Sequence, residues 1–260
     1  MKKINSLFVV LLLMLASFTA GVQYQRGDVD HDGQVGISDV TCLIDYLLNG
    51  KWGDEPVTPD GHEYVDLGLP SGTLWATCNI GANSPEEYGY YFAWGETQTE
   101  PREVYNWSTY KWSNGSYFTL TKYCTKSNFG NNGFVDNKTE LDPEDDAAYV
   151  NWGDNWRMPT YDQQTELLTV CTWTWTTRNG VNGRLVIGPN GNTIFLPAAG
   201  FRFGSSQYSV GSEGDYWSRT LNSDYTTNAY SVYFNSEDVN WDYLNRSRAF
   251  TVRAVRASQE

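Results

Sequence analysis

The chain has 260 residues, of which 31 are acidic and 18 are basic, and its formal net charge is −13. This excess of negative charge repels a phosphate backbone and so argues against a nucleic-acid-binding protein. Aromatic residues make up 15% of the sequence, which favours a loop-rich fold packed by large rings or a binding surface that uses them.

Residues 1–21 have the pattern of a secretory signal peptide. Two lysines precede an apolar run over residues 7–18, and small residues follow it. The run is too short to span a bilayer as a stable helix, and no later stretch is long and apolar enough to do so. We therefore expect cleavage near Ala20 or Gly21, and a mature protein that is secreted or held at the cell surface without a membrane span.

Residues 22–50 contain a calcium-binding pattern. The stretch DVDHDGQVGISD, residues 28–39, places side-chain oxygens at its first, third, fifth and twelfth positions and glycine at its sixth. This is the EF-hand spacing, in which carboxylates surround the ion and glycine permits a sharp turn. A solvated acidic turn is the alternative, although its carboxylates would repel one another without a cation. The predicted calcium ligands are Asp28, Asp30, Asp32, the Gln34 carbonyl and Asp39.

A short helix is predicted directly after this loop. Residues 40–48 carry apolar side chains at helical spacing, and Asn49-Gly50 predicts the end of the helix. Loop and helix together, residues 27–49, resemble one repeat of a type I dockerin, the calcium module that docks enzymes onto cohesins. The resemblance implies a cohesin-like partner. A complete dockerin has two repeats and no second one follows, so a calcium-stiffened stalk is the alternative.

A linker and a strand pair are predicted next. Residues 51–62 are rich in proline, glycine and aspartate, as linkers are. Beyond them, residues 63–69 and 73–80 predict two strands joined by a tight Pro-Ser-Gly turn.

Two short helices and a run of late strands are predicted in the rest of the chain. Ser84 with the following proline predicts one helix start, and Thr160 with Gln163 predicts another through a capping box. Helices early and strands late indicate an α+β fold. The late strand segments are CTWTW (171–175), RLVIG (184–188), TIFLPAAGF (193–201), AYSVYF (229–234) and AFTVRAVR (249–256).

Several blocks resemble a known family. DLGLPSGTLWATCNIGA, YFAWGET, WGDNWRMPT, LPAAGFR and the C-terminal YWSRT, AYSVYF and AFTVRAVR look like the major paralogous domain of Fibrobacter and Bacteroidales surface proteins. That domain is similar to the C-type lectin and formylglycine-generating enzyme superfamily. The resemblance implies a C-type-lectin-like fold for residues 63–260, in which the first and last strands lie together and a long irregular region forms a ligand-binding face.

The residues needed for several kinds of catalysis are missing. The formylglycine-generating enzymes use a late pair of cysteines, and here no cysteine follows Cys171. His31 and His62 are the only histidines, so the large domain offers none to a catalytic triad or a histidine-bound zinc. We therefore expect no catalytic residues. One acidic stretch predicts a solvated loop, with a weak second calcium site or glycoside-cleaving carboxylates as alternatives: Asp142, Glu144, Asp145 and Asp146.

The cysteines leave their pairing open. Export permits disulfides, and four cysteines allow three pairings, while free thiols are equally compatible with the sequence. The four are Cys42, Cys78, Cys124 and Cys171.

The segment 215–248 has the composition of an adaptable binding surface. Asn, Tyr, Ser and Asp supply 19 of its 34 residues, a mixture of rigid rings and adaptable polar groups. Trp217 falls in a family block and is expected in the core, whereas Arg219, Arg246 and Arg248 are candidates for binding a carboxylate. The predicted ligand-binding residues are Asn222, Asp224, Tyr225, Asn240, Trp241, Asp242, Tyr243 and Asn245.

These patterns favour an exported, non-catalytic recognition protein that binds an extracellular protein or glycan. One alternative is a dockerin-bearing component of extracellular polysaccharide degradation, which would bind or cleave glycan. A second is a target of a diversity-generating retroelement, since such elements scatter Asn codons to Tyr, Asp and Ser. A structural stalk is a third.

Overall fold

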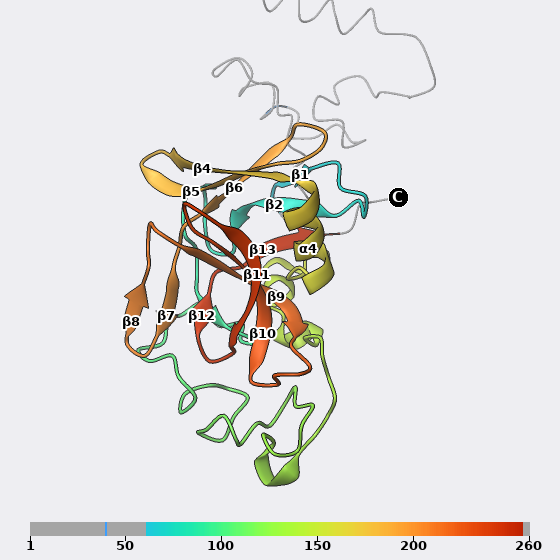
Figure 1. Cartoon of the computed structure of the whole chain (residues 1–260), viewed down its shortest axis with the longest axis vertical. Coiled ribbons are helices and arrows are strands. Elements are labelled where there is room, and N and C mark those ends of the chain that lie inside the picture. The colour runs from blue at the N-terminus through green and yellow to red at the C-terminus, as the bar shows by residue number, and fades with distance from the viewer. Residues whose placement is uncertain (1–39, 41–60, 257–260) are drawn as a thin grey trace, which may run out of the picture. The chain divides into compact units, whose positions relative to one another are not determined.

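Strands dominate the part of the chain that the computed structural model describes, which is Val40 and residues 61–256 (Figure 1). The chain divides into two units, Met1–Pro56 and Val57–Glu260, and the fold below is that of the larger one. The predicted signal peptide, calcium loop and most of the linker lie outside the described residues, so the boundaries at residues 21, 50 and 62 stay predictions.

One sheet brings the first and last described strands together. Trp75 lies opposite Val65 on one side and opposite Val255 on the other, so the central strand pairs with both ends of the domain. The two predicted strands and their tight turn are confirmed, and the closure of the two ends is the arrangement that the family resemblance implies. The strands are β1 (Tyr64–Asp66), β2 (Leu74–Asn79) and β13 (Arg253–Arg256).

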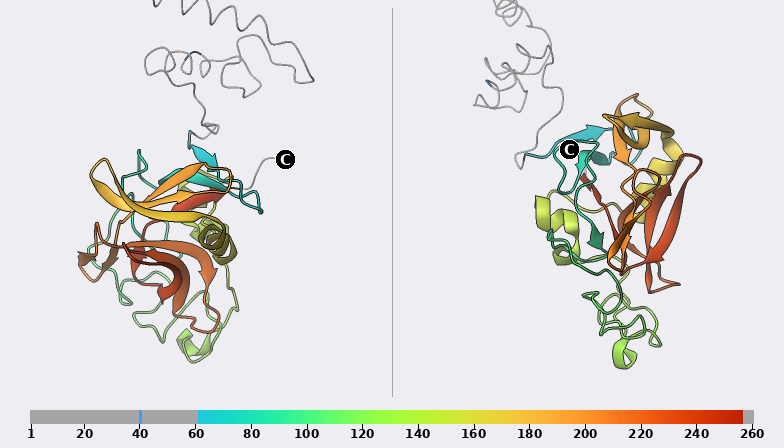
Figure 2. Two further views of the ribbon diagram at one scale, coloured as in Figure 1. Left: turned by 45° about the horizontal axis from the view of Figure 1, so that its top comes forward. Right: turned by 90° about the vertical axis from the view of Figure 1, so that its left-hand side faces the viewer.

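Three further sheets are ordered β4–β5–β6, β11–β10–β9 and β3–β12–β7–β8, and their paired strands run antiparallel (Figures 1 and 2). Asn179 and Gly180, both at positive φ, form the tight turn between β4 and β5. Each predicted late strand is present. The strands are β3 (Phe92–Ala93), β4 (Thr172–Arg178), β5 (Val181–Ile187), β6 (Thr193–Pro197), β7 (Phe201–Phe203), β8 (Ser206–Tyr208), β9 (Gly214–Leu221), β10 (Asn228–Phe234), β11 (Val239–Asn245) and β12 (Ala249–Phe250).

Over residues 61–256 the helical elements are α3 (Ala147–Trp152), α4 (Tyr161–Val170) and two single 3₁₀ turns, Asn131–Gly133 and Pro143–Asp145. No helix in the described ranges has the length and apolar character needed to cross a membrane. The mixture of helices with many short strands agrees with the predicted α+β class.

The capping box predicted for α4 is present. The Gln163 backbone N–H donates to Thr160 Oγ1 at 3.1 Å, and the Thr160 N–H donates to Gln163 Oε1 at 3.0 Å. Leu167 is fully buried on the inner face of this helix, whereas Leu168 and Cys171 are half-buried.

The helix predicted at Ser84 is wrong, because the segment forms only a turn closed by the Glu87 N–H on the Ser84 carbonyl. The chain must return at once to the end of β2, where the Tyr90 N–H donates to the Ile80 carbonyl at 2.8 Å. Gly89 makes the return possible, since it has φ +70° and a Cβ there would lie 2.4 Å from the same carbonyl oxygen.

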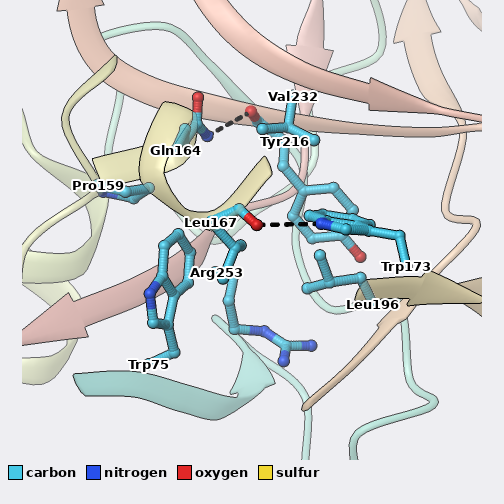
Figure 3. Close-up of a pocket in the computed structure, with 9 residues that line it drawn as sticks. All are labelled: Trp75, Pro159, Gln164, Leu167, Trp173, Leu196, Tyr216, Val232 and Arg253. Atoms are coloured by element: carbon cyan, nitrogen blue, oxygen red, sulfur yellow. Dashed lines mark hydrogen bonds between the residues drawn. The ribbon is translucent and has the colours of Figure 1, made fainter. Parts of the chain in front are cut away.

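The β9–β10–β11 sheet contributes side chains to two core clusters, one on each face. Trp217, expected in the core, is buried on one face and stacks on Phe250 with ring centroids 4.0 Å apart. On the other face Tyr216 packs below α4, where the Gln164 amide donates to its carbonyl at 3.0 Å (Figure 3). The sheet is therefore held from both sides.

The three cysteines in the described ranges are free thiols: Cys78, Cys124 and Cys171. Cys124 is buried, and its thiol donates to the Lys126 carbonyl at 3.2 Å. Cys42 lies outside the described residues.

Replacing Thr160 with alanine should lower the free energy of unfolding by about 1 kcal/mol, because the Gln163 N–H loses its acceptor at the start of α4. Thr160→Ser keeps the oxygen and should unfold close to wild type. Urea unfolding followed by tryptophan fluorescence measures both; equal stability of the alanine and serine variants would contradict the assignment.

Candidate functional site

The segment expected to bind ligand is largely a sheet rather than a set of loops, with β9, β10 and β11 linked by short turns. Alternate residues of a strand face opposite sides of its sheet. Trp241 and Tyr243 therefore share one face, opposite Val232 and Tyr230 of β10. Asn240 and Asp242, predicted as part of the same site, lie on the other face.

Five aromatic side chains gather on the first face, and we call them the aromatic row. Tyr243 stacks between Tyr225 and Trp241, with centroids 5.4 and 6.3 Å away and interplanar angles of 7° and 26°. Tyr230 meets Trp241 edge to face at 6.1 Å, and Tyr161 lies 4.3 Å from Tyr230. The sequence predicted three members as binding residues: Tyr225, Trp241 and Tyr243.

Tyr161 joins the row from a distant part of the chain. It is the first residue of α4, and its backbone N–H donates to Thr220 Oγ1 on β9 at 3.0 Å. The N-cap at Thr160 thus fixes the ring against the sheet, where it meets Trp241 at an angle of 84° and 5.9 Å. No local pattern marks this tyrosine, because its partners are more than fifty residues away.

The loop before β10 presents Tyr225 outward. Asn222 Oδ1 accepts hydrogen bonds from the backbone N–H groups of Asp224 and Tyr225 at 3.0 and 3.1 Å. Thr226, fully buried, anchors the end of the loop by donating from its hydroxyl to the Tyr123 carbonyl at 3.2 Å. Asn222 is itself 4% exposed, so its prediction as a ligand-contacting residue is wrong; it shapes the loop instead.

The row is partly open to solvent. Tyr225 is 57% exposed and Trp241 is 43% exposed, whereas the other three rings are half-buried between them. Burial raises the pKa of the Tyr230 hydroxyl, and the neighbouring Tyr161 and the exposed Asp224 add to the effect. The solvent-facing part of the row is therefore aromatic ring surface beside the Tyr230 hydroxyl and the Asp224 carboxylate.

The opposite face of the sheet carries acidic groups. Asp215 is 2% exposed, and burial, with Glu213 and Asp242 adding to it, raises its pKa to about 8, against the opposing effect of Arg248. Asp242 is half-buried and Asn240 is exposed. These two residues thus belong to a different surface from the aromatic row.

Other predicted residues serve the fold. The Asn245 side chain accepts from the backbone N–H and hydroxyl of Ser247 at 3.1 and 2.9 Å, closing a turn. Arg246 is fully buried and donates to the Tyr123 carbonyl at 2.7 Å. Arg219 pairs with Glu140 at 3.0 Å. Of the three arginines considered for carboxylate binding, only Arg248 has a guanidinium with neither an ion pair nor a carbonyl acceptor within the described residues.

The acidic stretch at 142–146 is not the solvated loop expected, because Asp145 and Asp146 are buried. The carboxylates of Asp142, Glu144 and Asp145 offer oxygens within 4.8 Å of one another, close enough to hold one metal ion. Lys122 already places its ammonium 2.6 Å from both Asp142 and Asp145. Although burial opposes it, the Lys122 hydrogen bond lowers the pKa of Asp142.

The Asp146 carboxylate accepts hydrogen bonds from backbone N–H groups. It caps α3 by accepting from the N–H groups of Ala148 and Tyr149 at 2.9 and 3.1 Å, and it also accepts from Met158. The residues predicted to bind calcium, Asp28, Asp30, Asp32, Gln34 and Asp39, lie outside the described residues.

No family model, curated protein or solved structure matches this chain. The aromatic row is therefore the candidate site on the strength of its own geometry.

Asp215 makes stability depend on pH. Its folded pKa of about 8 lies above the unfolded value of about 4, so between these values the folded state binds more protons than the unfolded one. The free energy of unfolding should fall as pH rises through this window, by up to about 1.4 kcal/mol per pH unit. Asp215→Asn should flatten that fall, which urea titrations at acidic and mildly alkaline pH would show. An unchanged slope in the variant would assign the dependence to other groups.

Proposed function

We propose that this chain is an exported, non-catalytic recognition protein that binds its ligand on the aromatic row. The feature that supports this is the exposure of Tyr225 and Trp241 at 57% and 43% in a group of five contacting rings. Exposed aromatic clusters with adaptable polar neighbours are typical of binding surfaces. Four of the rings come from a sheet and a capped helix, and the fifth, Tyr225, comes from a loop held by Asn222 and Thr226. The surface is therefore formed before the ligand arrives, and little ordering entropy is lost.

The chemistry of the row suits a ligand with flat apolar faces and hydroxyl or amide groups. Tyr and Trp rings offer apolar area, and their hydroxyl and indole groups donate hydrogen bonds at the edges. Asp224 lies close enough to influence the Tyr230 hydroxyl and supplies an acceptor. A glycan presents alternating apolar ring faces and hydroxyls of this kind, and we place it first; an extracellular protein with exposed side chains is the second ligand class.

The C-type-lectin-like fold remains part of the proposal. Closure of the domain by pairing of β2 with β13 supports it, as does the large irregular stretch between β3 and α3. The signal-peptide pattern supports export. The dockerin-like repeat at residues 27–49 favours one alternative, in which the chain is recruited to an assembly that degrades polysaccharide.

Trp241→Ala and Tyr225→Ala should each weaken binding of a glycan or protein ligand about tenfold or more, since central aromatic side chains carry much of the binding energy. A glycan array and a panel of secreted proteins would first identify the ligand, and calorimetry would then compare the variants.

The matched control is Phe118→Ala, which removes a ring that is 50% exposed and lies outside the aromatic row. It should leave affinity unchanged. Loss of affinity in the Phe118 variant with normal binding by the Trp241 variant would move the site away from the row.

We further propose that the N-terminal loop binds calcium through Asp28, Asp30, Asp32, Gln34 and Asp39. Asp30→Ala should lower calcium affinity at least tenfold, because one of few charged ligands is lost. Glu144→Ala should change calcium affinity little, because Lys122 already pairs with the acidic cluster to which Glu144 belongs. Calorimetry on the chain lacking residues 1–21 tests both, and the reverse order of effects would place the ion at the cluster.

A further inference from the structure

A small surface cavity lies beside β3, away from the strands that carry the aromatic row. Its polar lining comes from Glu96, Gln98, Glu100 and Arg102, and the rest comes from Tyr91, Tyr105 and the β3 residues Phe92 and Ala93. Glu96 and Arg102 form an ion pair at 3.0 Å and are only 12% and 23% exposed. The cavity thus contains a largely buried guanidinium.

One edge of this guanidinium is already used. Arg102 Nη1 donates to the carbonyl oxygen of Thr109 at 2.5 Å and bonds to the Glu96 carboxylate. Its Nε and Nη2 atoms are buried and have no hydrogen-bond partner among the residues that the structure describes. These two N–H groups point from the same edge of the planar group, the edge that binds a carboxylate through two parallel hydrogen bonds.

Other buried arginines do not combine these features. Arg246 lacks a partner at Nε alone, and Arg256 lacks partners at Nε and Nη1, which belong to different edges. Contact with an aromatic ring does not separate the two, since the Arg256 guanidinium lies 5.0 Å from the Tyr64 ring and that of Arg102 lies 4.8 Å from the Tyr105 ring. Among the arginines of the described residues, Arg102 alone combines two unpartnered nitrogens on one edge with a place in the lining of this cavity.

The surrounding charges disfavour a doubly charged anion. Arg202 lies over both tyrosine rings of the lining, 5.9 Å from Tyr91 and 5.7 Å from Tyr105, and has no ion pair among the described residues. Glu96 is satisfied by Arg102 and by the Lys111 N–H at 2.8 Å. Exposed Glu100 adds a negative charge to the lining, which disfavours a doubly charged phosphate more than a carboxylate.

The donors are held in place before a ligand arrives. The Arg102 backbone N–H donates to the Tyr105 hydroxyl at 3.2 Å, and that hydroxyl donates to the Tyr91 carbonyl at 3.4 Å. The Tyr91 hydroxyl in turn donates to the Ala199 carbonyl and accepts from Gln207, both at 2.6 Å. The lining is thereby tied to β7–β8 and its preceding turn.

We propose that this cavity is a carboxylate-binding subsite, in which Arg102 donates from Nε and Nη2 to the two oxygens of a ligand carboxylate. Two sources present this group: the uronic acid of an acidic glycan and the C-terminus of a peptide. The subsite is independent of the aromatic row, since it shares no residue with it.

The test follows the arginine Nε–H resonances of ¹⁵N-labelled protein during titration with sodium glucuronate, with N-acetylglycine, and with the methyl ester of each. We expect the Arg102 resonance to shift with at least one acid and with neither ester. A response to glucuronate alone identifies an acidic glycan as the ligand, and a response to N-acetylglycine alone identifies a peptide C-terminus. A response to both shows that the site recognises the carboxylate group itself.

Three variants sharpen the result, and calorimetry compares their affinities because Arg102→Lys removes the resonance that the titration follows. Arg102→Lys keeps the charge but removes the two-donor edge, and should weaken binding about tenfold; Arg178→Lys, at a side chain that is 49% exposed, should not. Glu100→Gln removes a repelling charge and should tighten binding.

Absence of a shift with both acids, equal shifts with acids and esters, or unchanged affinity in Arg102→Lys would overturn the proposal. If Arg102→Lys fails to fold, the acid and ester titrations of the wild-type chain decide alone. Trp241→Ala should leave the Arg102 response intact, so failure of this subsite and failure of the aromatic row are distinguishable.

Discussion

The guanidinium of Arg253 is fully buried, and its three nitrogens donate to three acceptors on two different sheets. Nε bonds to Asn79 Oδ1 at 2.9 Å and Nη1 to the Ala76 carbonyl at 3.1 Å, both on β2, while Nη2 reaches the Phe195 carbonyl on β6 at 2.9 Å. Burial lowers its pKa, and a buried charge is tolerated only when its donors are satisfied. The β1–β2–β13 and β4–β5–β6 sheets must therefore keep their relative position.

The third sheet is joined to the same group. Asn79 also donates from its amide to the Tyr216 hydroxyl at 3.2 Å, and that hydroxyl donates to the Pro197 carbonyl at 2.8 Å. Tyr216 belongs to β9, so this network also positions the β9–β10–β11 sheet. The Tyr216 carbonyl in turn accepts from the Gln164 amide of α4 (Figure 3). The aromatic row depends on this placement, because Tyr161 of α4 completes the group of rings that β10 and β11 present.

Arginine has two different roles in this protein. Arg246 and Arg253 are fully buried and donate mainly to backbone carbonyls, which ties long irregular segments and strands together without a buried acid. In Arg102, by contrast, Nη1 donates to the Thr109 carbonyl, while Nε and Nη2 lack partners among the described residues. The proposed carboxylate subsite and the proposed aromatic binding surface would together suit a ligand with apolar faces and a carboxylate.

Local patterns in the sequence predicted most of the strands, the helix α4 and three of the five residues of the aromatic row. The capping box at Thr160, the paired strands around the Pro-Ser-Gly turn and the late β segments depend on neighbouring residues, and all were predictable. The short run at Ser84 failed because a tertiary contact, the return of Tyr90 to Ile80, overrides the capping signal.

Only the tertiary structure decided which side chains act together. The sequence analysis did not predict β11 as a strand, so it could not show that Trp241 and Asp242 face opposite sides of a sheet. The contact between Tyr161 and Trp241 joins residues far apart in the sequence, and no local spacing predicts it. The loop that begins at the buried Asn222 likewise depends on a distant segment, since Thr125 hydrogen-bonds to Ser223 and Thr226. Hydrogen bonding within a turn or strand is encoded locally, whereas burial and the completion of a site depend on what the rest of the chain packs against it.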